Sequence, residues 1–249
     1  MFDAYTVRAR LAPAVAAVLP ALAMLGVAFL GGDDVSKIPF IVIGAAGLVV
    51  TGLVRDRGRA LEPGLWRSWD GAPTTQRLRW AGALDKAAVA ARHEQLQQLT
   101  GRQLPDGAAE ASDPPGADAR YAEAVGILRQ RTRDPDKFRV LFSENCDYGF
   151  RRNSLGLKAF ALPLAVLAGL ASAAVLVEGV GESGFDAGRW ILALVVSVVL
   201  AGYWALIVKP QWVHRSAERY TDRLFEELAG LTAPGSGVPG ANVGPRERS

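Results

Sequence analysis

Four long apolar runs, each without a single Asp, Glu, Lys, Arg or His, constrain this sequence more than any other feature. They cover residues 11–30, 38–54, 159–177 and 190–208. A bilayer core about 30 Å thick needs about 20 apolar residues of helix to cross it. The chain is 50% hydrophobic but also 21% charged, so its apolar residues are concentrated in these runs. We therefore expect an all-α integral membrane protein with four transmembrane helices arranged as two hairpins.

The first run allows a second interpretation. Arg8 and Arg10 precede it, and the small-residue sequence Ala21-Leu22-Ala23 lies within it, which is also the pattern of a cleaved signal peptide. The run continues to residue 30, beyond such a cleavage site, and this favours a retained helix. Either outcome leaves the orientation of the other three runs unchanged.

The lysines and arginines predict the orientation. The two short connections, residues 31–37 and 178–189, hold one each, and the other 26 of the 28 lie in the termini and in residues 55–158. Because cationic segments stay on the cytoplasmic side, we expect both termini in the cytoplasm. The Ala/Gly/Arg-rich composition resembles that of a bacterial genome of high GC content, so the expected membrane is the bacterial inner membrane. The predicted regions are a cytoplasmic N-terminus (1–10), a first transmembrane hairpin (11–54), a small, mainly helical cytoplasmic domain (55–158) inserted before a second hairpin (159–208), an amphipathic cytoplasmic helix (209–231) and a disordered tail (232–249).

Within these regions, finer patterns predict local structure. Residues 81–100 have helical spacing, residues 101–117 have the Pro/Gly/Asp-rich composition of a disordered loop, and Asp118 is expected to cap the next helix. The segment Phe-Arg-Val-Leu-Phe, residues 138–142, suggests a short strand-like or buried element. Small residues recur every four positions at Ala165, Gly169 and Ala173, a spacing that lets helices pack closely within the bundle or between copies of the chain.

Several kinds of chemistry lack a sequence signature. The single cysteine, Cys146, excludes an intrachain disulfide, and together with two histidines it offers no recognisable metal-ligand spacing. No phosphate-binding glycine loop is evident, and the apolar runs lack the ionisable groups that proton relays and most transporters need. We therefore expect no catalytic residue, cofactor, metal or nucleic-acid partner.

The segment just before the third run carries the strongest candidate site. It contains six polar or basic residues: Glu144, Asn145, Tyr148, Arg151, Arg152 and Asn153. Arginine forks suit phosphate or carboxylate groups, so the segment could bind an anionic small molecule or a protein partner. It could equally form a collar at the membrane surface, in which both arginines meet lipid phosphates and Asn153 or Ser154 caps the third span.

A second group is aromatic. Trp66, Trp69 and Trp80 make up half of the tryptophans and follow the second apolar run. Indole rings at this position anchor a chain in the membrane interface or fill a small core, and a role in stacking on a ligand is the alternative.

These features favour a function other than catalysis. We expect a cytoplasmic domain that senses or docks a ligand or partner and couples it to the helical bundle. The bundle would self-associate and act as an oligomeric pore or membrane effector, for example in stress or antiphage signalling. The alternatives are a membrane-interface enzyme acting on a lipid-linked or nucleotide substrate, and a scaffold subunit of a membrane complex. The bilayer is the one partner that the composition itself implies.

Overall fold

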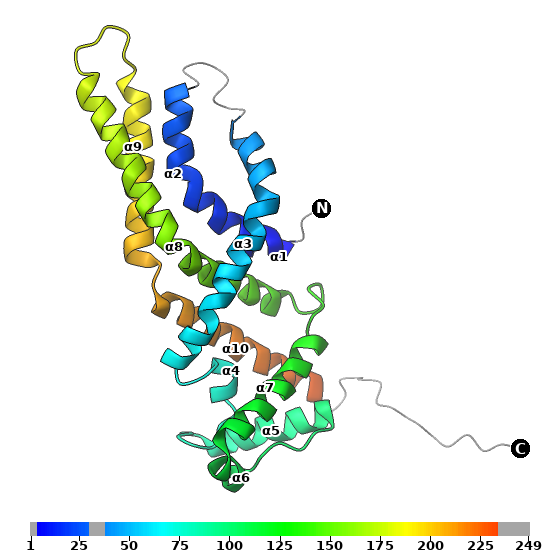
Figure 1. Ribbon diagram of the computed structural model, residues 1–249. Coiled ribbons are helices and arrows are strands. Elements are labelled where there is room, and N and C mark those ends of the chain that lie inside the picture. Colours follow the sequence, from blue (N-terminus) through cyan, green and yellow to red (C-terminus); the bar gives the residue numbers. More distant parts are fainter. Residues whose placement is uncertain (1–3, 30–37, 234–249) are drawn as a thin grey trace, which may run out of the picture. The chain divides into compact units, whose positions relative to one another are not determined.

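The computed structural model describes residues 4–29 and 38–233, and in that part of the chain every regular element is a helix (Figure 1). Two compact units can be distinguished. Unit 1 comprises the chain up to Trp69 together with Ser143–Ala217, and unit 2 comprises Asp70–Phe142 together with the chain from Glu218. Two helices, α8 (Arg139–Glu178) and α10 (Pro210–Thr232), contribute residues to both units.

Unit 1 contains the apolar helices. Besides most of α8 and the first part of α10, it holds α1 (Ala4–Thr6), the π-helix η1 (Val7–Leu11), α2 (Ala12–Phe29), α3 (Ile38–Ser68), α9 (Ala187–Gly202) and the π-helix η3 (Tyr203–Ile207). Three stretches, Ala4–Ala28, Arg139–Glu178 and Ala187–Ile207, are long and apolar enough to cross a membrane. The predicted second span, residues 38–54, forms the start of α3, and its side chains up to residue 51 lie outside the described residues.

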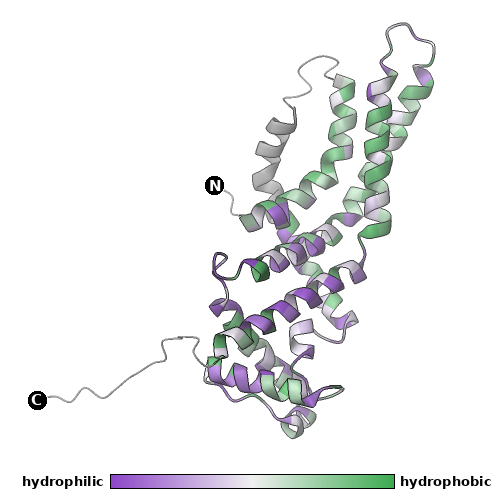
Figure 2. Cartoon of the chain, turned by 180° about the vertical axis from the view of Figure 1, so that it is seen from behind, coloured by the Kyte–Doolittle hydropathy of each residue, from purple (hydrophilic) through white to green (hydrophobic). Residues whose placement is uncertain are grey.

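The surface of these helices is unusually apolar. Leu167 and Leu170 on α8 and Leu192 on α9 are each 63% exposed, and Figure 2 shows the apolar colouring continuing along the upper part of the bundle. In water such a surface would be strongly unfavourable, whereas lipid solvates it well. The exposed leucines therefore agree with helices that cross a membrane.

Small residues bring α8 and α9 together, as their spacing predicts. Gly169 of α8 lies against Ser197 of α9, where a Cβ atom added to the glycine would be 3.4 Å from the serine Cβ. Ala165 and Ser197 are both fully buried. Elsewhere in unit 1, Trp204 and Val208 pack with Ala17 and Ala161 in an apolar cluster.

Unit 2 is a small helical core. It contains α4 (Pro73–Gln76), α5 (Lys86–Thr100), α6 (Gly107–Ser112) and α7 (Pro114–Arg131), the first residues of α8 and the end of α10. Its buried apolar residues include Leu96 from α5, Val125 and Leu128 from α7, and Leu224 and Leu228 from α10. The apolar face predicted for α10 is thus buried, and its last turns complete this core.

Three local predictions need correction. The segment 138–142, expected to be strand-like or buried, is buried at Phe138 and Leu141, but it leads into the first turn of α8 and is not a strand. The loop expected at residues 101–117 contains α6 and the start of α7, because Asp106 and Asp113 accept hydrogen bonds from the amides of Ala109 and Gly116 as N-caps. The cap of α7 is therefore Asp113, not Asp118.

Candidate functional site

The predicted polar segment before the third apolar run is not a cap but the middle of a helix. Because α8 begins at Arg139, residues 144–153 form successive turns of an uninterrupted helix. Neither Asn153 nor Ser154 can therefore cap the third span, and both side chains are buried. The helix distributes the six candidate residues among different faces, which the linear sequence does not reveal.

One face of α8 forms an ion pair with α3. Arg152 Nη1 lies 2.5 Å from Glu62 Oε1, and the hydroxyl of Tyr148 donates to the same oxygen at 3.0 Å. The Arg152 side chain is only 9% exposed and that of Glu62 is 20% exposed. Arg152 is therefore engaged by Glu62 inside the protein.

Asn153 connects the same region of α8 to the N-terminal helix. Its Nδ2 donates to the backbone carbonyl of Ala9, in η1, at 2.6 Å, and the side chain is 1% exposed. The residue four positions after Ala9 is Pro13, which has no N–H to offer this carbonyl. The asparagine therefore supplies a donor that the proline cannot. We call Glu62, Tyr148, Arg152 and Asn153 the polar junction.

Glycines allow the helices to approach closely enough for these contacts. A Cβ atom on Gly156 of α8 would lie 3.0 Å from the backbone nitrogen of Gly58 on α3. A Cβ atom on Gly149 would lie 2.9 Å from the Ala9 Cβ and 2.7 Å from the Tyr5 hydroxyl. The backbones of α3 and α8 thus come into contact beside the polar junction, and only glycine permits so close an approach.

A neighbouring face of α8 holds the start of α10. Arg151 pairs with Asp147, one turn earlier, at 3.1 Å and donates to the Trp212 carbonyl at 3.1 Å. Its guanidinium carbon also lies 4.9 Å from the centre of a Trp212 ring. Two turns after Arg151, Lys158 Nζ donates to the Val208 carbonyl at 2.7 Å, at the end of η3, where a cation is favoured by the helix dipole.

The remaining predicted residues are divided between the units. Glu144 and Asn145 are half-buried in the turn of α8 before Tyr148. Trp66 and Trp69 are half-buried at the end of α3, and the Trp69 ring is 4.6 Å from that of His214. Trp80 belongs to unit 2, where its Nε1 donates to the Pro105 carbonyl at 3.0 Å and its ring meets His93. Its contacts therefore lie within unit 2.

Sequence reasoning missed Glu62, the acid on which the polar junction depends. Glu62 follows a run of arginines on α3, and its pairing with α8 joins positions 90 residues apart. Asp56 lies closer to the second apolar run than Glu62 does, so no local signal singles out Glu62.

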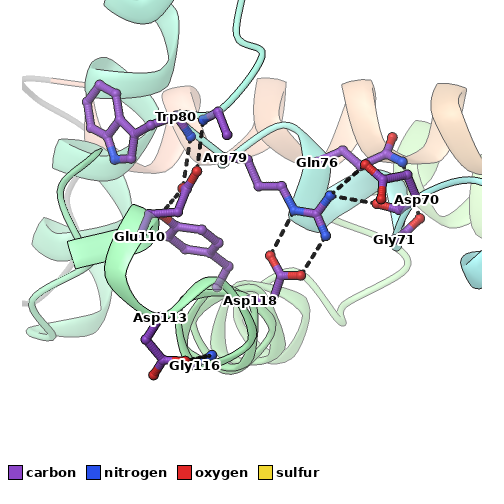
Figure 3. A network of polar contacts seen from close by, with 11 residues as sticks. Asp70, Gly71, Gln76, Arg79, Trp80, Glu110, Asp113, Gly116 and Asp118 are labelled. Carbon is purple, nitrogen blue, oxygen red and sulfur yellow. Dashed lines mark hydrogen bonds and ion pairs between the residues drawn. The ribbon is translucent and has the colours of Figure 1, made fainter. Parts of the chain in front are cut away.

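Unit 2 has its own polar network, which sequence reasoning also missed (Figure 3). Arg79 holds both carboxylate oxygens of Asp118, at 2.8 and 2.5 Å, and reaches the backbone carbonyl of Asp70 at 2.6 Å. The hydrogen bonding to Asp118 raises the pKa of Arg79, so this forked pair remains charged. The pair joins the segment after α4 to α7, and the Asp70 contact also ties this segment to the turn after α3.

Glu110 is the buried centre of this network. It is 4% exposed and accepts hydrogen bonds from the amides of Trp80 and Ala81 and from the Tyr121 hydroxyl, at 2.9, 2.8 and 2.7 Å. Burial opposes ionisation, but the three donors outweigh it and lower the pKa of Glu110. Burial, reinforced by the carboxylate, raises the pKa of Tyr121. Every contact is internal, so the network stabilises unit 2 and offers no open reactive group.

A scan against protein-family models and searches of curated proteins and of solved structures found no match for this chain. Within residues 4–29 and 38–233, no group of three or more His, Cys, Asp or Glu side chains is placed to hold a metal ion. The polar junction of unit 1 is therefore the candidate site, on the strength of its geometry alone.

Proposed function

We propose that the chain is a multi-pass protein of the bacterial inner membrane that couples an event in the cytoplasm to its membrane helices. In this proposal four spans form two hairpins, residues 55–158 form an inserted cytoplasmic domain and both termini are cytoplasmic. The placement of 26 of the 28 lysines and arginines supports this orientation. A ligand or protein partner binds the cytoplasmic domain, and self-associated bundles respond as a pore or membrane effector.

The observation that carries the proposal is the continuity of α8. This helix begins at Arg139 within unit 2, carries Arg152 and Asn153 at the polar junction, and continues to Glu178 as a candidate membrane span. A continuous helix passes displacement of one end to the other more directly than a flexible linker does. The buried pair between Glu62 and Arg152 then acts as a latch on this helix, because a buried ion pair favours one helix register over others.

The interpretation as an enzyme has less support. A catalytic or anion-binding role would require arginine donors turned toward a substrate, whereas Arg152 is held by Glu62 and Arg151 by Asp147 and the Trp212 carbonyl. These contacts favour a structural role for both guanidinium groups. Among the residues that the structure describes, no contact specifically favours the scaffold alternative.

The test is the membrane potential of bacteria that express the protein, measured with a potential-sensitive dye. Glu62→Gln breaks the latch, and we expect stronger depolarisation than with the wild type at equal amounts in the membrane. Asp56→Asn is the matched control, because it removes an exposed acid from the same helix, where Asp56 pairs with the neighbouring Arg55.

A charge-reversed double variant, Glu62→Arg with Arg152→Glu, keeps the proposal falsifiable if the single variant is poorly inserted. Restoring an ion pair should restore wild-type behaviour. Glu62→Gln could insert normally and give the same membrane potential as Asp56→Asn. In that case the bundle is not a latched effector, and the enzyme or scaffold interpretation takes its place.

A further inference from the structure

An exposed arginine lies against an exposed aromatic ring where α3 meets the apolar part of α8. The guanidinium carbon of Arg57 is 4.5 Å from the centre of the Phe160 ring. Arg57 is exposed, and Phe160 is 55% exposed at the second position of the third apolar run. This arginine therefore differs from Arg152, which is buried in an internal ion pair.

The apolar neighbours of this pair continue in the direction of the span. Leu53 lies one turn before Arg57 on α3 and is 60% exposed, and Leu167 lies two turns after Phe160 on α8 and is 63% exposed. Residues four or seven positions apart share a helix face, so on each of the two helices an exposed leucine follows the pair in the direction of the span. Neither water nor hydrocarbon alone solvates both the guanidinium and these leucines well.

A cation–π contact also orients the guanidinium. The ring attracts the charge through its face and takes none of the five N–H donors, which remain available to a phosphate in a forked geometry. We propose that Arg57 and Phe160 form a binding site for the phosphate of an anionic phospholipid, whose acyl chain lies along Leu53 and Leu167. The site requires only that the apolar helices lie in a membrane, and it is independent of the proposed coupling function.

The experiment is a lipid competition on the full-length protein purified in mild detergent. The protein is incubated with equal amounts of dioleoylphosphatidylglycerol and dioleoylphosphatidylcholine, and the retained lipids are counted by native mass spectrometry. The wild type should retain the anionic lipid preferentially. Because one basic residue near a membrane surface contributes roughly a fivefold preference for anionic lipid, Arg57→Gln should lower the retained ratio about fivefold.

The matched control is Arg67→Gln, which removes the same charge from an exposed position on the same helix, ten residues further from the apolar run. It should leave the ratio unchanged. Phe160→Leu keeps the apolar surface but removes the ring, and it should lower the ratio by a smaller factor. This variant also covers the case in which Arg57→Gln fails to fold, as judged by thermal unfolding.

Excess inorganic phosphate distinguishes a lipid headgroup from a free anion. If it leaves the anionic lipid bound, the acyl chain contributes to binding as proposed. If it displaces the lipid from the wild type, the site recognises phosphate alone and the lipid assignment is overturned. Equal ratios for Arg57→Gln and Arg67→Gln would overturn the site itself, since general surface charge would then account for the preference.

Discussion

The crossing of α3 and α8 makes Gly156→Ala the most informative substitution. The added Cβ would lie 3.0 Å from the Gly58 nitrogen, 3.1 Å from the Arg57 carbonyl carbon and 3.2 Å from the Gly58 Cα. All three are backbone atoms, so no side chain can rotate out of the way. Because non-bonded carbons prefer a separation of about 3.5–4.0 Å, α3 must retreat by about 0.5 Å as a body. That movement also strains the polar junction.

Two opposing effects determine how Gly156→Ala changes the free energy of unfolding. Replacing glycine by alanine inside a helix stabilises it by about 1 kcal/mol, and overpacking a tight contact costs about 1–3 kcal/mol. Gly64 on α3 provides the control, since a Cβ atom there meets nothing within 4 Å. Gly64→Ala should therefore show only the stabilisation of the helix, and the free energies of unfolding of the two variants should differ by about 1–3 kcal/mol.

Thermal unfolding of the purified protein in detergent measures this difference. At about 2–4 °C per kcal/mol for a chain of this size, Gly156→Ala should unfold at least about 2 °C below Gly64→Ala. If the two alanine variants are stabilised equally, the helices do not touch at Gly58 and Gly156, and the geometry of the polar junction is wrong.

Three further predictions concern buried polar groups. Glu110→Ala leaves three donors unsatisfied and should destabilise unit 2 by about 2–4 kcal/mol, seen as a lower unfolding temperature; an unchanged temperature would show that the donors are solvated. Burial lowers the pKa of His93, whose Nε2 lies 2.8 Å from the Leu78 carbonyl, so the unfolded chain takes up a proton first as the pH falls below 6.5. The contribution of His93 to stability should therefore decrease below that pH. The free energy of unfolding of His93→Gln should accordingly depend less on pH in this range than that of the wild type. Lys158→Met removes the ammonium from the Val208 carbonyl and should destabilise unit 1 by about 1–2 kcal/mol, whereas an exposed control, Lys209→Met, should change the unfolding temperature little.

Periodicity and hydropathy predicted the elements whose signal is spread over many residues. The apolar runs from 159 and 190 lie in α8 and α9, and α10 is an amphipathic helix as predicted, with Val213, Leu224 and Leu228 buried on its apolar face. Each of these predictions rests on many residues that favour the same outcome, so no single contact decides it.

The errors lie where one side chain decides the outcome. Asp113 followed by two prolines has the composition of a loop, yet an N-cap before proline at the first helical position starts a helix. Glu62 and Arg152 meet only because α3 and α8 cross at Gly58 and Gly156, and neither sequence neighbourhood contains information about that crossing. Long-range pairing of this kind follows from tertiary packing and leaves no local pattern.

Cysteine accessibility in intact bacterial cells tests the central claim, that the apolar helices cross the membrane with the arginine-rich connection in the cytoplasm. In a Cys146→Ser background, Glu182→Cys reports on the connection between α8 and α9, and Gln98→Cys reports on α5; both positions are exposed. A membrane-impermeant maleimide should label Glu182→Cys in intact cells and Gln98→Cys only after the cells are permeabilised. Labelling of Gln98→Cys in intact cells, with Glu182→Cys protected, would contradict the orientation and the proposals that depend on it.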